Sequence, residues 1–325
     1  MERDRFNVRE ALAWSVRNRM GTDDALMICG MLPLFWDTRG FVAEGLRWTR
    51  ALVAMTTADG TTEARGRAHT AMGWLEMLAG EPDESEWALA TATQMFRDLG
   101  DDNWLGRALS MRGMTTYNRN LLDEAEEQFN EAIVLCRQFG LEWLADAWCT
   151  YGLAHIALSR GDFGTAATLL HHCLDYSKSH NLAWGIGHTQ LSLGVMSFMM
   201  GDLDQSVERL IESILVRREL RDARGLCDCL GVMSLHASVR GDHELAAVLI
   251  GAAEVAREAS GDHLVPWLQP LIEQAVVGAT TALGQDYDRH LMEGRRLSMA
   301  EAISLIIERF PVGDGARTDQ VPATA

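Results

Sequence analysis

The sequence has little proline, and it lacks the signals of secreted and membrane proteins. Six of its 325 residues are proline, and none lies between residues 83 and 265. This absence favours uninterrupted helices, because proline breaks a helix interior. No run of about 18 apolar residues occurs, and no charged-then-apolar leader opens the chain. We therefore expect a cytoplasmic protein that does not cross a membrane.

Cysteine is scarce as well, and its pattern predicts neither disulfides nor a metal site. The six cysteines are Cys29, Cys136, Cys149, Cys173, Cys227 and Cys229. Their spacing matches no disulfide framework, so we expect reduced thiols. His171-His172-Cys173 and Cys227-x-Cys229 contain ligand types, but adjacent helical residues point in different directions and no second pair has ligand spacing. No metal ion or other cofactor is expected.

Basic residues are fewer than acidic ones, and this limits the kinds of partner that we expect. The net charge is −17 and the isoelectric point is near 5.0. Such a surface repels phosphate backbones, so we expect no direct nucleic-acid binding; cationic or neutral partners fit better. The sequence contains no G-x-x-x-x-G-K-[ST] phosphate loop, and Gly313-Asp-Gly315 is too short to be one. Nucleotide hydrolysis therefore has no basis in this sequence.

A repeat of about 40 residues is the main signal that is present. Turn residues recur at Gly40, Gly80, Asn120, Gly161, Gly201 and Gly241, with spacings of 40, 40, 41, 40 and 40. A second landmark falls near Gly100, Gly140, Asn181, Asp222 and Gly261. A third, at Trp104, Trp143, Trp184 and Arg224, opens the next helix. Three landmarks in step indicate tandem helical hairpins.

Local chemistry divides each unit into two helices. Gly161, Gly201 and Gly241 suit the left-handed position after a helix. The aspartate after each, as at Asp162 and Asp202, can cap the next helix. Apolar residues between these turns follow helical spacing, and no stretch shows strand alternation. We predict an all-α fold, a right-handed α-solenoid of tetratricopeptide-like hairpins.

The two ends differ from the middle. Residues 1–61 are predicted to form an N-terminal helical pair, and residues 62–261 five repeats. Residues 262–310 are predicted to form a C-terminal helical cap that begins with the proline-bounded stretch LVPWLQP. A capping box, Ser298-Met-Ala-Glu301, opens its last helix. Residues 311–325 are predicted to be a disordered tail. Atypical ends fit a repeat array.

The chain resembles the C-terminal helical-repeat region of actinobacterial STAND-type ATPases, including LuxR-type transcription regulators. The resemblance covers nearly the whole chain, from about residue 2 to residue 309, and three stretches carry it. They are Asn7-Val-Arg-Glu-Ala-Leu-Ala-Trp14; Leu249-Ile-Gly-Ala-Ala-Glu-Val-Ala-Arg257; and Ala282-Leu-Gly-Gln-Asp-Tyr with Glu293-Gly-Arg-Arg-Leu-Ser-Met-Ala-Glu-Ala302. The resemblance implies a sensing module. The family's ATPase and helix-turn-helix modules are missing, so the chain is either the sensor part of a longer regulator or a stand-alone descendant.

In tetratricopeptide-like arrays the first helix of each hairpin lines a groove. Placing Gly73, Gly113, Gly152, Gly194 and Ser234 in equivalent positions predicts an apolar floor edged by a polar row. The predicted ligand-binding residues are Arg67, Trp74, Met77, Arg107, Met114, Tyr117, Asp146, Cys149, His188, Phe198 and Asp228. Such a surface suits a small apolar effector or an amphipathic peptide or protein partner.

The same residues also have simpler, purely structural interpretations. Apolar periodicity alone does not separate a groove from a core. The polar row is equally compatible with a solvated ladder of salt bridges. Two other functions stay open: a plain protein scaffold, and an enzyme in which His188, Asp146 and Asp228 act as acids and bases. No nucleophile or oxyanion arrangement accompanies these three residues, so we predict a regulatory binding module with no catalytic residue. Its oligomeric state is not predicted.

Overall fold

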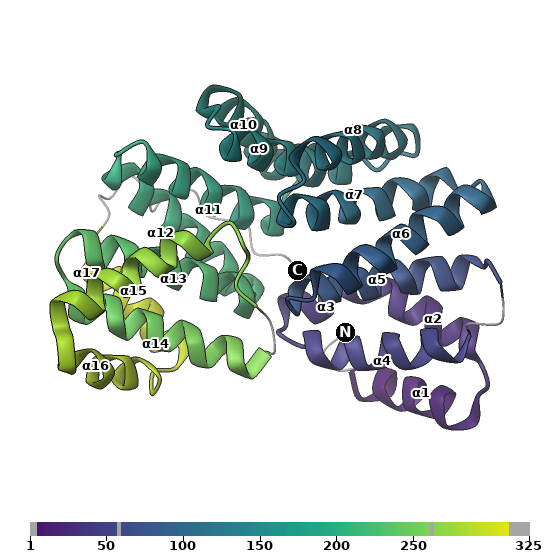
Figure 1. Ribbon diagram of the computed structural model, residues 1–325, viewed down its shortest axis with the longest axis horizontal. Coiled ribbons are helices and arrows are strands. Elements are labelled where there is room, and N and C mark those ends of the chain that lie inside the picture. The colour runs from purple at the N-terminus through teal and green to yellow at the C-terminus, as the bar shows by residue number, and fades with distance from the viewer. Residues whose placement is uncertain (1–4, 57–59, 261–262, 312–325) are drawn as a thin grey trace. The chain divides into compact units, whose positions relative to one another are not determined.

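A computed structural model of the chain describes residues 5–56, 60–260 and 263–311. Its elements within these ranges are all helices, and the described residues contain no strand (Figure 1). The fold is an all-α solenoid of helical hairpins, which confirms the prediction from the repeat. None of the described helices is long and apolar enough to cross a membrane.

The chain divides into two compact units, residues 1–37 with 41–152 and residues 38–40 with 153–325. Unit 1 holds α1 (Arg5–Asn18), α2 (Thr22–Met31), α3 (Pro33–Thr38) except its last residue, α4 (Val42–Met55), α5 (Glu63–Leu78), α6 (Pro82–Leu99), α7 (Asp102–Asn118), α8 (Leu122–Gln138) and the π-helix η1 (Trp143–Cys149). The N-terminal segment thus contains four helices where the sequence suggested a pair.

Unit 2 continues from residue 153 within α9 (Thr150–Ser159). It contains α10 (Phe163–Ser179), α11 (Ala183–Met199), α12 (Leu203–Leu220), α13 (Ala223–Val239), α14 (His243–Ser260), α15 (Gln269–Leu283), the 3₁₀ turn η2 (Gly284–Asp286), α16 (Tyr287–Gly294) and α17 (Met299–Arg309). The five hairpins are α5–α6, α7–α8, η1/α9–α10, α11–α12 and α13–α14. The predicted tail lies outside the described residues from residue 312 onward.

The turns inside the hairpins match the predicted landmarks. All six have positive φ, at Gly40, Gly80, Asn120, Gly161, Gly201 and Gly241. Three of the four described turns between hairpins also match, at Gly100, Gly140 and Asn181; Gly261 lies outside the described residues. At the fourth turn, Arg221 takes the left-handed conformation instead of Asp222. Asp222 instead caps α13, its Oδ1 accepting from the Gly225 N–H at 3.0 Å.

The predicted aspartate caps also form. Oδ1 of Asp162 accepts from the Thr165 N–H at 3.0 Å, and Oδ1 of Asp202 accepts from the Gln205 N–H at 3.1 Å. In the C-terminal cap, Ser298 and Glu301 form the predicted reciprocal capping box. These bonds satisfy backbone donors that a helix start leaves without partners, so the hairpin ends are fixed by local sequence.

First and second helices differ in burial. Most of α5 and α13 is buried, whereas α8 and α10 each bury a single stripe. Each first helix packs between second helices, and glycines permit this approach. A Cβ on Gly73 would lie 2.5 Å from Leu89, and one on Gly194 would lie 3.0 Å from Leu210. In both cases the neighbour lies 16 residues later, on the second helix of the same hairpin.

The third hairpin departs from the predicted register. Gly152 faces Phe129, on the second helix of the preceding hairpin. Counting back seven residues from the turn at Gly161, as from Gly80 to Gly73, reaches Ala154, which is fully buried. The two-residue shift accompanies the one spacing of 41 residues among the turns inside the hairpins, from Asn120 to Gly161. η1 lies within this spacing, and a π-helix is the form in which a helix accommodates one extra residue.

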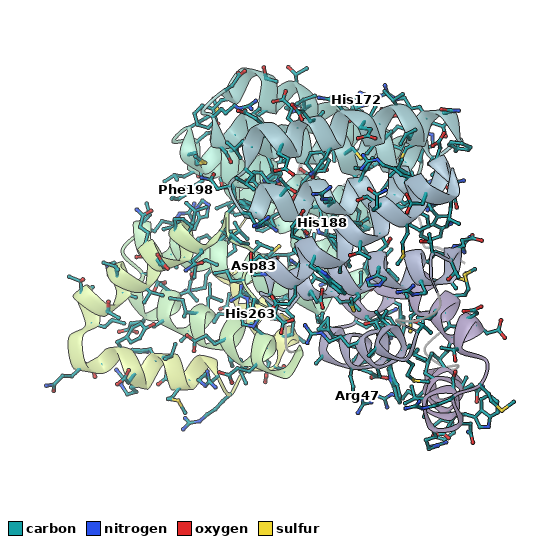
Figure 2. All side chains as sticks on the ribbon, turned by 45° about the vertical axis from the view of Figure 1, so that its right-hand side comes forward. Arg47, Asp83, His172, His188, Phe198 and His263 are labelled. Atoms are coloured by element: carbon teal, nitrogen blue, oxygen red, sulfur yellow. The ribbon has the colours of Figure 1, made fainter. Side chains whose placement is uncertain are left out.

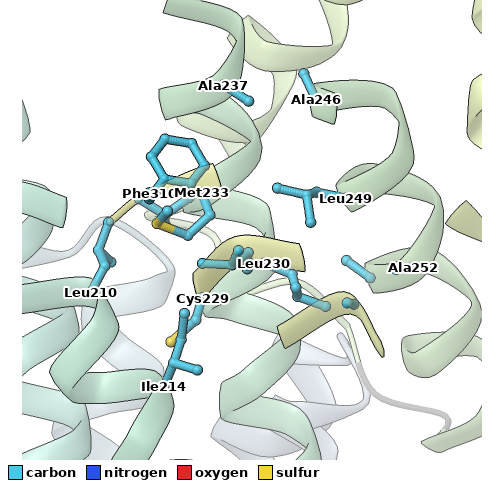
Figure 3. Close-up of a cluster of buried hydrophobic side chains, with 14 of the residues drawn as sticks. Leu210, Ile214, Cys229, Leu230, Met233, Ala237, Ala246, Leu249, Ala252 and Phe310 are labelled. Atoms are coloured by element: carbon cyan, nitrogen blue, oxygen red, sulfur yellow. The ribbon is translucent and has the colours of Figure 1, made fainter. Parts of the chain in front are cut away.

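Within unit 2, the C-terminal cap completes the core of the last hairpins. Leu210 of α12, Met233 of α13, Leu249 of α14 and Phe310, directly after α17, belong to one buried cluster (Figure 3). The ring of Phe310 also lies beneath Arg240, at 4.9 Å. α16 packs closely on α14, because a Cβ on Gly251 would lie 2.1 Å from the Leu291 carbonyl oxygen.

Candidate functional site

The candidate site is a face of the first helices. It lies on the side of each first helix that points away from the second helix of the same hairpin. The unit 1 face comprises Thr70, Trp74, Met77, Ser110, Met114, Tyr117 and Tyr151. The unit 2 face comprises His155, Leu158, Leu191, Val195, Phe198, Gly231, Leu235 and Ser238. With the register of the third hairpin corrected, Trp148, Tyr151 and His155 take the places that the sequence assigned to Asp146, Cys149 and Leu153.

The unit 2 face is covered by a segment of the same chain. Along α13, a Cβ on Gly231 would lie 2.4 Å from Ile272, so Ile272 occupies the space above this glycine. Leu235 shares a buried cluster with Ala275. One turn further, a Cβ on Gly278 would lie 2.3 Å from the Ser238 hydroxyl. α15 therefore lies along the row that the sequence predicted as a groove floor.

Residues before α15 extend this cover. Leu268 is fully buried and belongs to the cluster that contains Leu191 and Val195 of α11. The ring of Trp267 meets His155 of α9 edge-on, with centroids 4.6 Å apart. Phe198, which Figure 2 labels on α11, packs against the cluster of Leu235 and Ala275. We call residues 264–283 the docked segment, because together they lie against α9, α11 and α13.

The unit 1 face is filled by side chains. The ring of Trp148 meets that of Trp74 edge-on at 5.0 Å and stacks on Tyr151 at 6.4 Å. Its indole N–H donates to the Ser110 carbonyl at 3.2 Å. Trp74, Met114 and Tyr117 are buried, and Met77 is half-buried. Trp148 therefore joins the first helices of three hairpins from within the repeats.

The predicted polar row is divided among several local partners. The guanidiniums of Arg67 and Arg107 lie 4.3 Å and 5.2 Å from the ring centroid of Trp104. Arg67 is also paired with Glu63, one turn earlier on α5. Asp146 pairs with Arg137 at 2.5 Å. These contacts are closer to the ladder of salt bridges, the alternative interpretation of the polar row, than to a set of side chains that all face one ligand.

Two members of the row lie in unit 2. Asp228 is buried and lies 3.5 Å from Arg257 of α14. The ring of His188 lies against that of Trp184 in a tilted arrangement, with ring centroids 4.2 Å apart, and its Nδ1 lies 3.2 Å from the Trp184 carbonyl oxygen. Cys149, on η1, is fully buried. Contact between any of the predicted residues and a ligand stays a prediction.

The histidines of the site are poor acid–base groups at neutral pH. Burial, followed by the charges of Arg217 and Arg224, lowers the pKa of His188 well below its usual value. Burial lowers the pKa of His155 to about 3. The lowered pKa disfavours the acid–base role that the sequence left open for His188. Both rings are neutral at pH 7, so proton transfer by either is unfavourable.

The cysteines and the metal-ligand types complete the chemistry of the described residues. All six cysteines are buried. Burial raises the pKa of Cys29 to about 12 and that of Cys229 to about 11, which keeps these thiols protonated. Among the described residues, no group of three or more His, Cys, Asp or Glu side chains is arranged to hold a metal ion.

A second surface feature lies on α6, outside the predicted groove. A shallow depression of about 440 Å³ is lined by Thr61, Trp87, Ala90, Thr91, Gln94, Met95 and Asp98. Trp87 is 58% exposed. Neither this depression nor the roles of Trp148 and Trp267 were predicted from the sequence. The 41-residue spacing was the signal that could have located Trp148.

Comparisons with known proteins support the fold. A family model described as "Anaphase-promoting complex subunit 5" matches residues 153–237. No curated protein matches the chain. Among solved structures, the Rap conjugation gene regulator of the plasmid pLS20, in complex with the Phr* peptide, is similar with a TM-score of 0.55 and 12% identity, covering 84% of this chain and 76% of that chain. BtubC (BKLC) from P. vanneervenii aligns with a TM-score of 0.42 and 15% identity, over 76% of this chain and 91% of that chain.

Proposed function

We propose that this protein is a regulatory binding module without catalytic activity, and that its first-helix faces bind an amphipathic helical segment of a partner protein. One observation carries the proposal: the unit 2 face already holds a helix, α15, along Gly231, Leu235 and Ser238. A surface that accommodates a helix of its own chain has the shape and apolarity to accept one from another protein.

The similarity to the Rap regulator supports this proposal. That structure contains the Phr* peptide, so a repeat array of similar fold is compatible with peptide binding. The net charge of −17 favours a basic or neutral partner segment. The lowered pKa values of His155 and His188 argue against the alternative of an acid–base enzyme.

The regulatory context that we propose is that of the STAND and LuxR-type regulators. The stretches near Trp14, Arg257 and Ala302 resemble segments of that family. In such a setting, a bound segment would bias the shape of the array and so control attached modules. A small apolar effector is the second ligand class that an apolar face of this kind accepts.

The test is a selection of displayed amphipathic helical peptides against the intact protein, followed by fluorescence anisotropy with the enriched sequences. We expect micromolar binding that weakens at least tenfold in Met77→Lys or in Phe198→Lys, since each places a charge on one first-helix face. Val134→Lys is the matched control, because Val134 is 66% exposed on α8. Circular dichroism melts verify that each variant is folded.

Two results would contradict the proposal: no enriched peptide, or peptides that bind both face variants as well as they bind the native protein. Thermal melts with a metabolite extract provide a separate test for the effector class. A melt raised by several degrees would move the assignment from a peptide to a small molecule.

A further inference from the structure

We propose that the docked segment, residues 264–283, is a releasable occupant of the unit 2 face, and that a partner helix of the same pattern displaces it. This inference rests on the proposed function for the identity of the competitor. The release itself is a property of this chain and can be measured without any partner.

The contacts define the pattern that the face recognises. Ile272, Ala275 and Gly278 follow one another at intervals of three residues and face Gly231, Leu235 and Ser238 of α13. A large aliphatic residue fills the space above a glycine, and two small residues allow the backbones to approach. A competing helix therefore needs one large aliphatic residue followed by two small residues, at intervals of three, on one face. An aromatic residue five positions before the large one would replace Trp267 against His155.

The docked segment is held by apolar packing alone. Its side-chain hydrogen bonds, such as Gln269 to Glu273 and Thr280 to the Val276 carbonyl, stay inside α15. No hydrogen bond or ion pair of the described residues joins an α15 side chain to α13 or α14. The buried part of α15 is small, comprising Ile272, Ala275 and Ala279. Release would therefore leave few polar groups without partners.

Among the described residues, the neighbouring cap helices form ion pairs with α14 and with Asp242 before it, whereas the side chains of α15 form none with the last hairpin. Arg295, directly after α16, is paired with Glu254 and Glu258 of α14. Arg309 at the end of α17 is paired with Asp242 at 2.6 Å. These ion pairs would hold α16 and α17 in place while α15 leaves. Undocking is thus a local event and does not require the whole cap to unfold.

A hinge lies at the end of α15. Gly284 has φ 54° and ψ −120°, a backbone conformation that favours glycine. A Cβ at this position would meet no atom within 4 Å, so the space beside this residue is open. Rotation about Gly284 is the simplest way for α15 to move while α16 stays fixed.

The experiment locks the segment with a disulfide. In the double variant Ser238→Cys and Gly278→Cys, the Cβ positions are 3.7 Å apart, which suits a disulfide. The native cysteines are buried, and the raised pKa values of Cys29, Cys136 and Cys229 make them poor competitors in oxidation. The same protein after reduction is the matched control.

Two readouts follow. Hydrogen exchange with mass spectrometry should show residues 264–283 exchanging at least tenfold faster than α13 and α16 in the reduced protein, and slowing to their rate after oxidation. The second readout uses a fluorescein-labelled synthetic peptide of residues 263–284. It should bind Ile272→Ala at least tenfold more tightly than it binds the native protein, because the resident segment competes less. It should not bind the oxidised double variant.

The control for Ile272→Ala is Val277→Ala, because Val277 lies on the same helix with 62% of its surface exposed. This change should alter neither exchange nor peptide binding. Equal exchange of α15 and α13 in the reduced protein would overturn the inference, and so would failure of the peptide to bind Ile272→Ala. Fast release with no peptide found by display would instead refute the proposed function and leave the releasable segment established.

Discussion

The two units cover equivalent rows of side chains in different ways. In unit 1, Trp148 and Tyr151 fill the face from within the third hairpin, against Trp74 and the Ser110 carbonyl. In unit 2, the docked segment covers the face from outside the repeats, and Ile272 lies above Gly231. An apolar face needs cover in either case. Cover supplied by a separate segment can leave without unfolding the hairpins, whereas cover built into a repeat cannot.

The largest effect is expected from a substitution that removes Trp148, the residue that covers the unit 1 face from within the third hairpin. Trp148→Ala should lower the free energy of unfolding of unit 1 by about 3–5 kcal/mol, because it removes a buried ring and leaves a cavity. Denaturant unfolding followed by hydrogen exchange in α7 measures this change. Trp143→Ala is the matched control on the same π-helix, because Trp143 is 41% exposed. Equal losses in both variants would show that Trp148 does not hold the unit 1 face together.

Acidification should change the stability of the two units by different amounts, because they contain different buried ionisable groups. Burial lowers the pKa of His155 to about 3 and that of His236 to about 4, both in unit 2. Unit 1 contains His69, with a pKa lowered to about 4, but also Glu76, whose pKa burial raises to about 7. The two groups in unit 1 act in opposite directions as the pH falls.

The sign follows from proton uptake. Below pH 6.5 the unfolded chain protonates these histidines and the folded chain does not, so stability is complete above pH 6.5 and is lost as the pH falls toward 4. Each ring costs roughly 1.4 kcal/mol per pH unit in this window. Glu76 has the opposite sign, since its folded form takes up a proton first.

We therefore expect unit 2 to lose about 4 kcal/mol between pH 7.5 and pH 5.5, from the buried rings of His155, His188 and His236, while unit 1 changes little. Hydrogen exchange in α7 and α11 at the two pH values measures the difference. His236→Gln should reduce the pH dependence of unit 2 without affecting unit 1. Equal losses in the two units would contradict this assignment.

The smallest effect should be the same in both units. Asp101→Ala in unit 1 and Asp202→Ala in unit 2 each remove a helix cap, and each should cost about 1 kcal/mol of stability. Thermal melts detect this loss, and Asp→Asn at the same positions should restore most of it. A much larger cost in one unit would mean that the capped turn also supports the cover of that face.

The sequence was sufficient to predict the hairpins, because their turns depend on local chemistry. Glycine or asparagine at the left-handed positions and aspartate at the caps specify each turn within a few residues. Arg221 was missed because a non-glycine residue seldom adopts the left-handed conformation, and its neighbour Asp222 looked more like a turn residue.

The candidate site was less predictable, because it depends on contacts between distant residues. Gly152 was chosen as the equivalent of Gly113 for its size, although counting from the turn at Gly161 leads to Ala154. This error placed Asp146 in the predicted polar row and Cys149 on the predicted floor, at the positions that Trp148 and Tyr151 occupy. Periodicity also gave no indication that Ile272 docks on Gly231, since it identifies an apolar stripe without naming what covers it.

The π-helix η1 also bears on the ancestry of the repeats. Hairpins that arose by duplication would share one length, and a spacing of 41 among spacings of 40 corresponds to one inserted codon. Such an insertion turns the residues on its two sides by about 100° relative to each other, unless a wider turn absorbs it. One added codon is thus enough to give a single copy of such a repeat inward-facing side chains of its own, as Trp148 and Tyr151 are in the third hairpin.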